Sequence, residues 1–183
     1  GWLGLALALC LIAFSELGVA LVNRAATFLM RPDALPRLDY AEGVPTDMRT
    51  LVVVPTMFGS AQGIASLVEG LEVRFLANRD PNVHFALLTD FFDAAEAQRP
   101  DDEALLDRAQ REIDVLNARY APEHGDRFFL FHRPRTWNPR ERVWMGFERK
   151  RGKLTALNAF LRGGARDAFL RIAGNTAALA RVR

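Results

Sequence analysis

The sequence is poor in cysteine and histidine and has a small net charge, so none of these features alone indicates the class of protein. Its 183 residues include a single cysteine, Cys10, which excludes an internal disulfide and fits a reducing compartment. Three histidines, His84, His124 and His132, show no metal-ligand spacing with that cysteine. The net charge is only +2, and no internal repeat or low-complexity tract occurs. The overall charge therefore does not by itself imply a nucleic-acid partner.

A long apolar run at the N-terminus is the first feature that is present. Residues 1–30 are mostly apolar, and the run is about as long as the roughly 20 residues that cross a bilayer. Glu16 interrupts it, and a carboxylate at membrane depth is costly unless it is paired, protonated or near an interface. No basic region precedes the run, which argues against a secretory signal peptide. We predict a transmembrane helix over 1–30, with a buried or interfacial helix as the alternative.

A proline-containing stretch separates this run from the rest of the chain. Residues 31–49 hold Pro32, Pro36 and Pro45, so they cannot continue a helix. They are interpreted as a linker that leads from the membrane side into a soluble domain over residues 50–183. With half of its residues hydrophobic, the chain has enough apolar side chains for one domain with a buried core.

The region from residue 50 onward alternates strands with helices. Short apolar runs predict strands at residues 51–54, 83–88 and 128–131. Apolar spacings of three and four predict helices over residues 64–75 and 105–120 and from Lys153 onward, and Pro100, Asp101 and Asp102 mark the start of the second of them. Pro55 is expected to stop the first strand, and residues 133–153 to form a long basic loop. This order predicts an α/β domain with a mostly parallel sheet and flanking helices.

Ligands of such sheets bind beyond the carboxyl ends of the strands. The three predicted strands and their loops bring to that edge Pro55, Thr56, Met57, Asp90, Asp93, His132, Arg133 and Arg135. Lys153 is expected to begin the helix that returns across the same edge. Carboxylates beside cations suit a ligand that carries hydroxyl or base donors together with phosphates. A sugar nucleotide is such a ligand.

The basic residues gather in one short segment, WMGFERKRGKLTALNAFLR, at residues 144–162. Its Arg and Lys residues surround Gly152, just ahead of the predicted helix. Free N–H groups and the helix dipole make such a start a natural phosphate site. We therefore predict that Lys153, with Arg149 or Arg151, contacts a phosphate.

Three segments of the sequence resemble a known family, in the same order and at similar spacings. LVVVPTMFGSAQGIASLVEGLE, VHFALLTDFFDA and WMGFERKRGKLTALNAFLRGG are similar to the glycosyltransferase domain of cyclic β-1,2-glucan synthases. SELGVALVNR, running into RPDALPRLDY, resembles the part ahead of that domain, so the resemblance covers essentially the whole chain. More broadly, the chain resembles the nucleotide-binding half of the fold shared with cellulose synthase-like enzymes. The resemblance implies the N-terminal half of a GT-A-like sheet.

The resemblance also implies roles for particular residues. An Asp at the end of the second strand binds the base or ribose in those enzymes, and Asp90 takes that place here. Their Gly-Lys-x-x-x-Leu-Asn segment supplies a Lys near the diphosphate, and it matches Gly152, Lys153, Leu157 and Asn158. The implied donor is UDP-glucose and the acceptor a growing glucan, with no nucleic-acid partner. The implied location is a bacterial inner membrane, with residues 50–183 on the cytoplasmic side.

Two departures from the family pattern limit these expectations. Asp90 is followed by Phe91 and Phe92 before Asp93, instead of forming an acidic pair, so either Asp is a candidate for the nucleotide. Residues 158–183 hold neither an Asp-x-Asp metal motif nor a general base. The resemblance then implies a piece of a larger enzyme. Its divalent metal, Mg or Mn, would be held by residues outside this chain, which carries no catalytic residue and is inactive alone.

Other interpretations of the same residues stay open. The basic stretch 133–153 could bind anionic lipid or nucleic acid in a non-catalytic domain near the membrane. A purely structural domain near the membrane is a third possibility. Trp137, Trp144 and Phe147 are interpreted as packing residues, with stacking of Trp144 on a sugar as the alternative.

Overall fold

A computed structural model describes residues 1–30, 40–120, 125–164, 166–180 and 182, in two compact units. The first unit, Gly1–Asp39, contains α1 (Trp2–Leu29), and the second is Tyr40–Arg183. Of the predicted linker, residues 31–39, with Pro32 and Pro36, lie outside the described residues. Residues 40–49 belong to the second unit and include a short 3-10 helix, Thr46–Met48.

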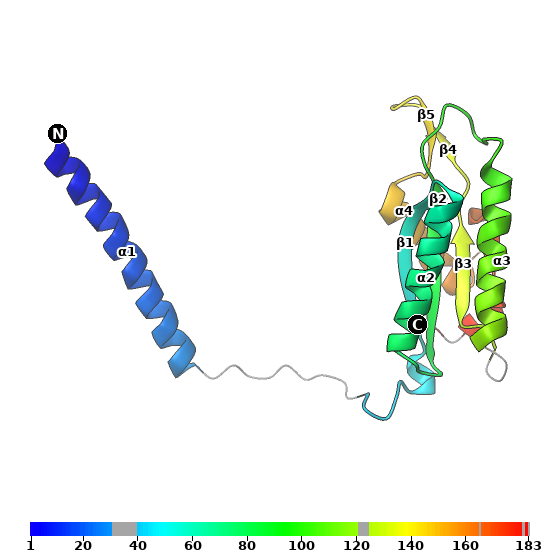
Figure 1. Ribbon diagram of the computed structural model, residues 1–183, viewed down its shortest axis with the longest axis horizontal. Coiled ribbons are helices and arrows are strands. Elements are labelled where there is room, and N and C mark those ends of the chain that lie inside the picture. Colours follow the sequence, from blue (N-terminus) through cyan, green and yellow to red (C-terminus); the bar gives the residue numbers. More distant parts are fainter. Residues whose placement is uncertain (31–39, 121–124, 165, 181, 183) are drawn as a thin grey trace. The chain divides into compact units, whose positions relative to one another are not determined.

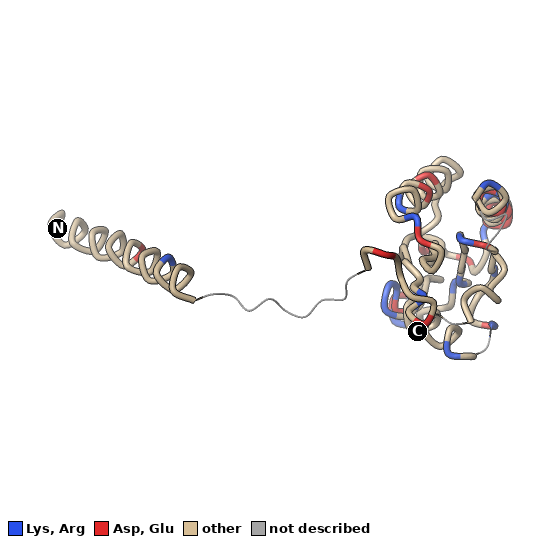
Figure 2. Tube along the Cα trace, turned by 90° about the horizontal axis from the view of Figure 1, so that it is seen from below, with Lys and Arg blue, Asp and Glu red and all other residues tan. Residues whose placement is uncertain are grey.

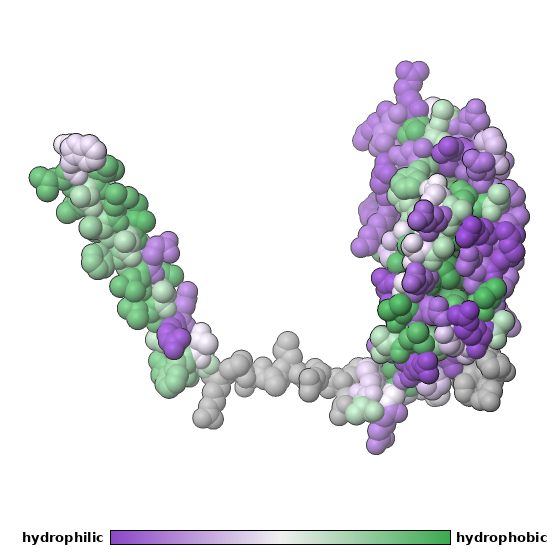
Figure 3. All heavy atoms as spheres, viewed as in Figure 1, coloured by the Kyte–Doolittle hydropathy of each residue, from purple (hydrophilic) through white to green (hydrophobic). Residues whose placement is uncertain are grey.

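The predicted N-terminal helix is confirmed as α1. Its side chains are exposed along its whole length, and Figure 3 shows apolar side chains over most of its surface. Its charged residues are Glu16 and Arg24 (Figure 2). By length and composition α1 is able to cross a membrane, a test that a signal sequence near the N-terminus also passes. The transmembrane assignment therefore stays a prediction.

The second unit is built on a four-stranded sheet in the order β1-β2-β3-β6, of which Figure 1 labels β1, β2 and β3. The three longer strands are parallel to one another: β1 (Thr50–Phe58), β2 (Val83–Phe91) and β3 (Phe128–His132). The short strand β6 (Arg171–Ala173) pairs antiparallel with β3 at one edge. The predicted α/β class with a mostly parallel sheet is confirmed.

Helices cover both faces of this sheet. α2 (Ala61–Ala77) and α3 (Asp102–Tyr120) pack on one face, and α4 (Arg149–Leu161) on the other. Because side chains alternate along a strand, Phe85 and Leu87 of β2 join the first core whereas Ala86 and Leu88 join the second. The apolar faces predicted for α2 and α3 are those that the sheet buries.

The predicted end of the first strand at Pro55 is wrong, because β1 continues to Phe58. β1 is the edge strand, where a missing N–H is tolerated. The Thr50 N–H donates to the Asn82 carbonyl, on the side of β2. Five residues later, Pro55 stands where an N–H would face away from β2, so the proline costs the ladder no hydrogen bond.

The chain between β3 and α4 also differs from the prediction. Instead of one long loop it holds a hairpin, β4 (Thr136–Asn138) and β5 (Val143–Met145). α4 begins at Arg149, four residues ahead of the predicted start at Lys153. The basic cluster is therefore the first turn of α4. Strand β6, in the segment after α4, was not predicted either.

Candidate functional site

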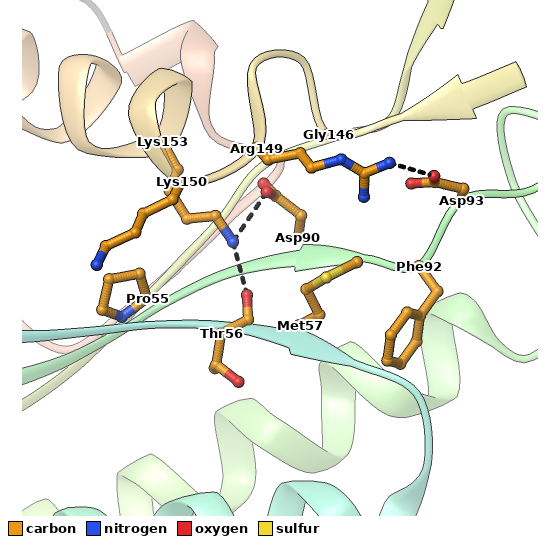
Figure 4. Close-up of a pocket in the computed structure, with 10 residues that line it drawn as sticks. All are labelled: Pro55, Thr56, Met57, Asp90, Phe92, Asp93, Gly146, Arg149, Lys150 and Lys153. Atoms are coloured by element: carbon orange, nitrogen blue, oxygen red, sulfur yellow. Dashed lines mark hydrogen bonds and ion pairs between the residues drawn. The ribbon is translucent and has the colours of Figure 1, made fainter. Parts of the chain in front are cut away.

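A cavity of about 420 Å³ lies at the carboxyl ends of β1 and β2, below the start of α4 (Figure 4). This is the edge at which the sequence predicts a ligand. The cavity is lined by Pro55, Thr56, Met57, Asp90, Phe92, Asp93, Gly146, Arg149, Lys150 and Lys153. The lining combines three cations and two carboxylates with a few apolar side chains.

Asp90 occupies the centre of a buried ion cluster. Only 2% of its surface is exposed. Arg133, from the end of β3, binds it with two hydrogen bonds, Nε to Oδ1 at 2.9 Å and Nη2 to Oδ2 at 3.1 Å. Lys153 Nζ lies 2.9 Å from Asp90 Oδ2 and donates to the Thr56 carbonyl at 2.7 Å. Asp90 thus holds two cations from two different elements.

The charges in this cluster do not cancel. Arg133 and Lys153 are both buried, and they share the single carboxylate of Asp90. Burial lowers the pKa of Lys153, and although Asp90 opposes this effect, the nearby charge of Arg133 adds to it. A buried excess of positive charge is unfavourable unless an anion compensates it.

The start of α4 adds positive potential in the same place. Its first three residues are Arg149, Lys150 and Arg151, and its first turn has no acidic residue. Cations at a helix N-terminus are opposed by the helix dipole, so this arrangement destabilises the helix in the absence of an anion. Arg149 and Lys150 line the cavity, where a bound anion would meet both the side chains and the dipole.

The turn that leads into α4 has an unusual backbone. Glu148 and Arg149 adopt positive φ values of 52° and 43°, which L residues with side chains rarely do. The Arg133 guanidinium holds this turn, because its Nη2 donates to the carbonyls of Phe147 at 3.1 Å and Arg149 at 3.3 Å. One arginine therefore fixes both Asp90 and the start of α4.

Two glycines allow these parts to approach closely. A Cβ on Gly146 would lie 2.5 Å from Asp90 Oδ2, and a Cβ on Gly152 would lie 2.2 Å from the Phe147 carbonyl. Both distances are shorter than real Cβ contacts. The absence of a side chain at each position is thus a steric requirement of the site.

Asp93 and Arg149 form the outer part of the cavity. Arg149 Nη2 donates to Asp93 Oδ2 at 2.8 Å, and both side chains are partly exposed. Asp93 Oδ1 is buried and has no hydrogen-bond partner among the described residues. The two carboxylates of the cavity are thus already engaged by cations. Among the described residues, Asp93 Oδ1 is the one carboxylate oxygen of the cavity that a divalent metal would find without a partner.

The described residues contain no group of three His, Cys, Asp or Glu side chains able to hold a metal ion. His132, at the end of β3, is instead a packing residue. It is fully buried between Phe58 and Phe91, and its Nδ1 lies 2.7 Å from Thr89 Oγ1. Burial lowers the pKa of His132 to about 3, so the imidazole is neutral near pH 7.

Comparison with known proteins gives one informative match. No protein-family model matches the chain. The cyclic beta-(1,2)-glucan synthase NdvB of Rhizobium meliloti (strain 1021) is 45% identical to it over 156 residues, which is 85% of this chain. The resemblance predicted from the sequence is confirmed. The chain spans 6% of the length of that synthase, so the similarity concerns a small segment of a much larger protein.

The structure places most of the predicted nucleotide-binding residues together. Six of them line the cavity: Pro55, Thr56, Asp90, Asp93, Arg149 and Lys153. Gly152 does not line the cavity and lies close to the Phe147 carbonyl. Arg151 is exposed and paired with Glu148, and Asn158 is exposed on α4; neither lines the cavity. Their roles toward a nucleotide stay predictions.

The sequence interpretation missed several contributors. Phe92, Gly146 and Lys150 line the cavity, and the clamping role of Arg133 was not foreseen. Gly146 follows an apolar pair of strand-forming residues, and a glycine in such a place often marks a close approach of the backbone. That signal was present in the sequence.

Proposed function

We propose that this chain forms the donor-binding part of a membrane-bound glycosyltransferase that transfers glucose from UDP-glucose to a growing β-1,2-glucan. Two facts support the proposal. The chain is 45% identical to a segment of a cyclic beta-(1,2)-glucan synthase. It also has a cationic cavity at the carboxyl edge of a mostly parallel sheet, as expected of a GT-A-like nucleotide-binding half.

The buried charge excess is the observation that carries the proposal. Arg133 and Lys153 share one carboxylate, and the start of α4 brings Arg149 and Lys150 to the same cavity. A diphosphate supplies the missing negative charge. In glycosyl transfer, negative charge develops on the leaving diphosphate, and cations fixed beforehand stabilise it.

Lys153 is the proposed phosphate contact inside the cavity. Its ammonium has three N–H donors, and among the described residues Thr56 and Asp90 accept two of them. The third N–H remains to donate to a phosphate oxygen of the sugar nucleotide. Arg149 is the proposed second contact in preference to Arg151, because Arg149 lines the cavity whereas Arg151 pairs with Glu148 outside it.

The two carboxylates take different roles in this proposal. Both oxygens of Asp90 are already bound by Arg133 and Lys153, so Asp90 positions the cations. Asp93 has an oxygen without a partner among the described residues, and its partner Arg149 is drawn away when it binds phosphate. Asp93 is therefore the proposed carboxylate for the hydroxyl or N–H donors of the nucleoside.

The remaining parts of the reaction lie elsewhere in the proposal. A divalent metal, Mg or Mn, supplies further charge to the diphosphate, and residues outside this chain hold it together with the base. α1 anchors the enzyme in a bacterial inner membrane. Residues 50–183 lie on the cytoplasmic side, where nucleotide sugars are made.

The alternative, a surface that binds anionic lipid or nucleic acid through residues 133–153, has less support. Three of its eight cations, Arg133, Arg135 and Lys153, are buried in ion pairs with Asp90 or Asp102. Of the five exposed ones, Arg149 and Lys150 line the cavity. A backbone-tracking or membrane-bound surface displays its cations to solvent. We therefore propose no nucleic-acid partner.

A calorimetric titration of UDP into the whole chain, kept in detergent, tests the proposal. Lys153→Met is expected to weaken UDP binding by about 10- to 100-fold, since hydrogen bonds to charged groups contribute roughly 1.5–3 kcal/mol. Arg149→Met is expected to weaken it less, and Arg74→Met, on the exposed surface of α2, not at all. Thermal unfolding of each variant checks that the fold is retained. Equal UDP affinity in the Lys153→Met and Arg74→Met variants would rule out the proposed donor site.

A further inference from the structure

The hairpin β4–β5 carries a pair of tryptophans that the donor cavity does not use. Trp137 and Trp144 lie opposite each other across the two strands. Their ring centroids are 5.8 Å apart and the ring planes are inclined at 56°. Trp137 is 46% exposed, although a tryptophan in a purely structural role is normally covered.

The hairpin holds this pair in a fixed position. The Asn138 side-chain oxygen accepts from the N–H groups of Arg140 at 3.0 Å and Glu141 at 3.3 Å, and the Asn138 carbonyl accepts from Arg142 N–H at 2.7 Å. Such side-chain bonds to the backbone stabilise tight turns. A ligand that binds the rings therefore meets an ordered surface and orders little on binding.

The hairpin is continuous with the wall of the donor cavity. Trp144 and Ala94 exchange two backbone hydrogen bonds, each of 2.9 Å, and Ala94 directly follows the cavity residue Asp93. At the other end, β5 runs into Gly146, which lines the cavity beside Asp90. The strand that carries Trp144 therefore borders the cavity through its backbone.

We propose that Trp137 and Trp144 form a stacking platform for the glucan acceptor. The C–H faces of a glucose ring are apolar, whereas its rim carries hydroxyl groups, so aromatic rings bind the faces. Trp137 is the more exposed of the two rings, so its outer face is the one on which a glucose unit would stack, with Trp144 supporting it from the opposite strand. This inference rests on the proposed transferase function, because a transferase must hold its acceptor beside its donor.

The charged residues in the turn at the tip of the β4–β5 hairpin favour a sugar over a lipid surface. The tip carries Arg140, Glu141 and Arg142 within three residues, all exposed. An anionic membrane attracts cations and repels a carboxylate. Sugar hydroxyls both donate and accept hydrogen bonds, so they are suited to a rim that contains both signs of charge.

Tryptophan fluorescence of the whole chain in detergent tests the platform. The sequence has three tryptophans, and a Trp2→Phe background leaves only Trp137 and Trp144. Addition of β-1,2-linked glucose oligosaccharides is expected to change the emission saturably, whereas mannitol, which has hydroxyls but no ring faces, is not. In the same background, Trp137→Ala is expected to weaken oligosaccharide binding roughly tenfold, as measured by calorimetry. Trp137→Phe, which keeps an aromatic ring, is expected to retain most of the binding.

The UDP titration separates this proposal from the donor proposal. Unchanged UDP affinity in Trp137→Ala shows that the fold and the cavity are intact. A chain that binds UDP but whose tryptophans do not respond to the oligosaccharides overturns the platform and leaves the donor site standing. An emission change caused by anionic lipid vesicles, with no response to sugar, also overturns it, in favour of a membrane contact.

Discussion

Arg133 faces Asp90 in a two-bonded pair, and the same guanidinium reaches the carbonyls of Phe147 and Arg149. The planar fork of an arginine is what allows these contacts to form together. Lysine would keep the charge but not this geometry. The pair therefore links the end of β2, the end of β3 and the start of α4.

Arg133→Lys is accordingly expected to lower the free energy of unfolding by about 2–4 kcal/mol, since a buried carboxylate loses part of its partner set. Urea denaturation measures this change. Arg149→Lys is the control, because its pair with Asp93 is partly exposed and surface pairs contribute about 0–1 kcal/mol. Similar losses in both variants would contradict the clamping role of Arg133.

Gly146→Ala tests the close approach at Asp90. The new Cβ meets Asp90 Oδ2 and Cγ at 2.5 and 2.6 Å, so the carboxylate must leave the position in which it binds Arg133 and Lys153. A destabilisation of about 1–3 kcal/mol is expected from such overpacking, together with weaker UDP binding. The matched control is Gly70→Ala in α2, where the nearest atom is the end of the flexible Arg74 side chain.

The control has a predicted direction of its own. Gly70 lies inside a helix, and alanine there is expected to stabilise by about 0.5–1 kcal/mol. Thermal unfolding of the two variants should therefore shift in opposite directions. A neutral Gly146→Ala variant with full UDP affinity would mean that the site tolerates a side chain at this position.

The Asp93→Asn variant tests whether Asp93 is the carboxylate that binds the nucleoside. Loss of the carboxylate is expected to weaken binding of uridine about tenfold, since a hydrogen bond to a charged group is replaced by one to a neutral amide. Inorganic pyrophosphate, which has no nucleoside, should bind at least as well, because Arg149 is no longer held by Asp93. Calorimetry with both ligands gives the answer, and unchanged uridine affinity would assign that role to another residue.

The buried histidines predict the response to acid. Burial lowers the pKa of His132 from 6.5 to about 3, so the folded protein binds this proton less readily than the unfolded chain. The contribution of the neutral ring to the free energy of unfolding is complete above pH 6.5 and decreases as the pH drops from 6.5 toward 3. The loss is about 1.4 kcal/mol per pH unit within that window.

His132→Phe, which keeps an aromatic ring between Phe58 and Phe91, is expected to flatten this pH dependence. Urea denaturation at several pH values measures it. His84 acts in the same direction, because burial and the nearby Arg127 lower its pKa to about 4. The variant therefore retains a residual slope, and an unchanged slope would show that His132 is not the group that titrates.

The sequence predicted the parts of the fold in which apolar spacing decides the structure. The buried faces of α2 and α3 and the run of β2 follow from side chains that must leave water. Apolar spacing did not predict the start of α4 correctly. Three consecutive cations are a poor helix start by local rules, and tertiary contacts with Arg133 override these rules.

Other differences have equally local causes. The hairpin β4–β5 is only three residues long in each strand, too short for alternation to be recognised. Its turn signal, Asn138 followed by Pro139, was available in the sequence. The edge of the sheet predicted that Asp90 and Lys153 lie in one crevice, but not that they form an ion pair. The clamp by Arg133 depends on a guanidinium that reaches three elements at once. No spacing rule contains that information.

Pro55, at the edge of the sheet, has a practical consequence for work with this chain. Among the described residues, no strand pairs with the outer side of β1, which is an apolar strand. Such an edge is the arrangement that leads separate molecules to add strand to strand and precipitate. The proline breaks the row of donors partway along it. Preparations should therefore stay soluble longer than the apolar character of β1 suggests, and replacing Pro55 by valine would remove that protection.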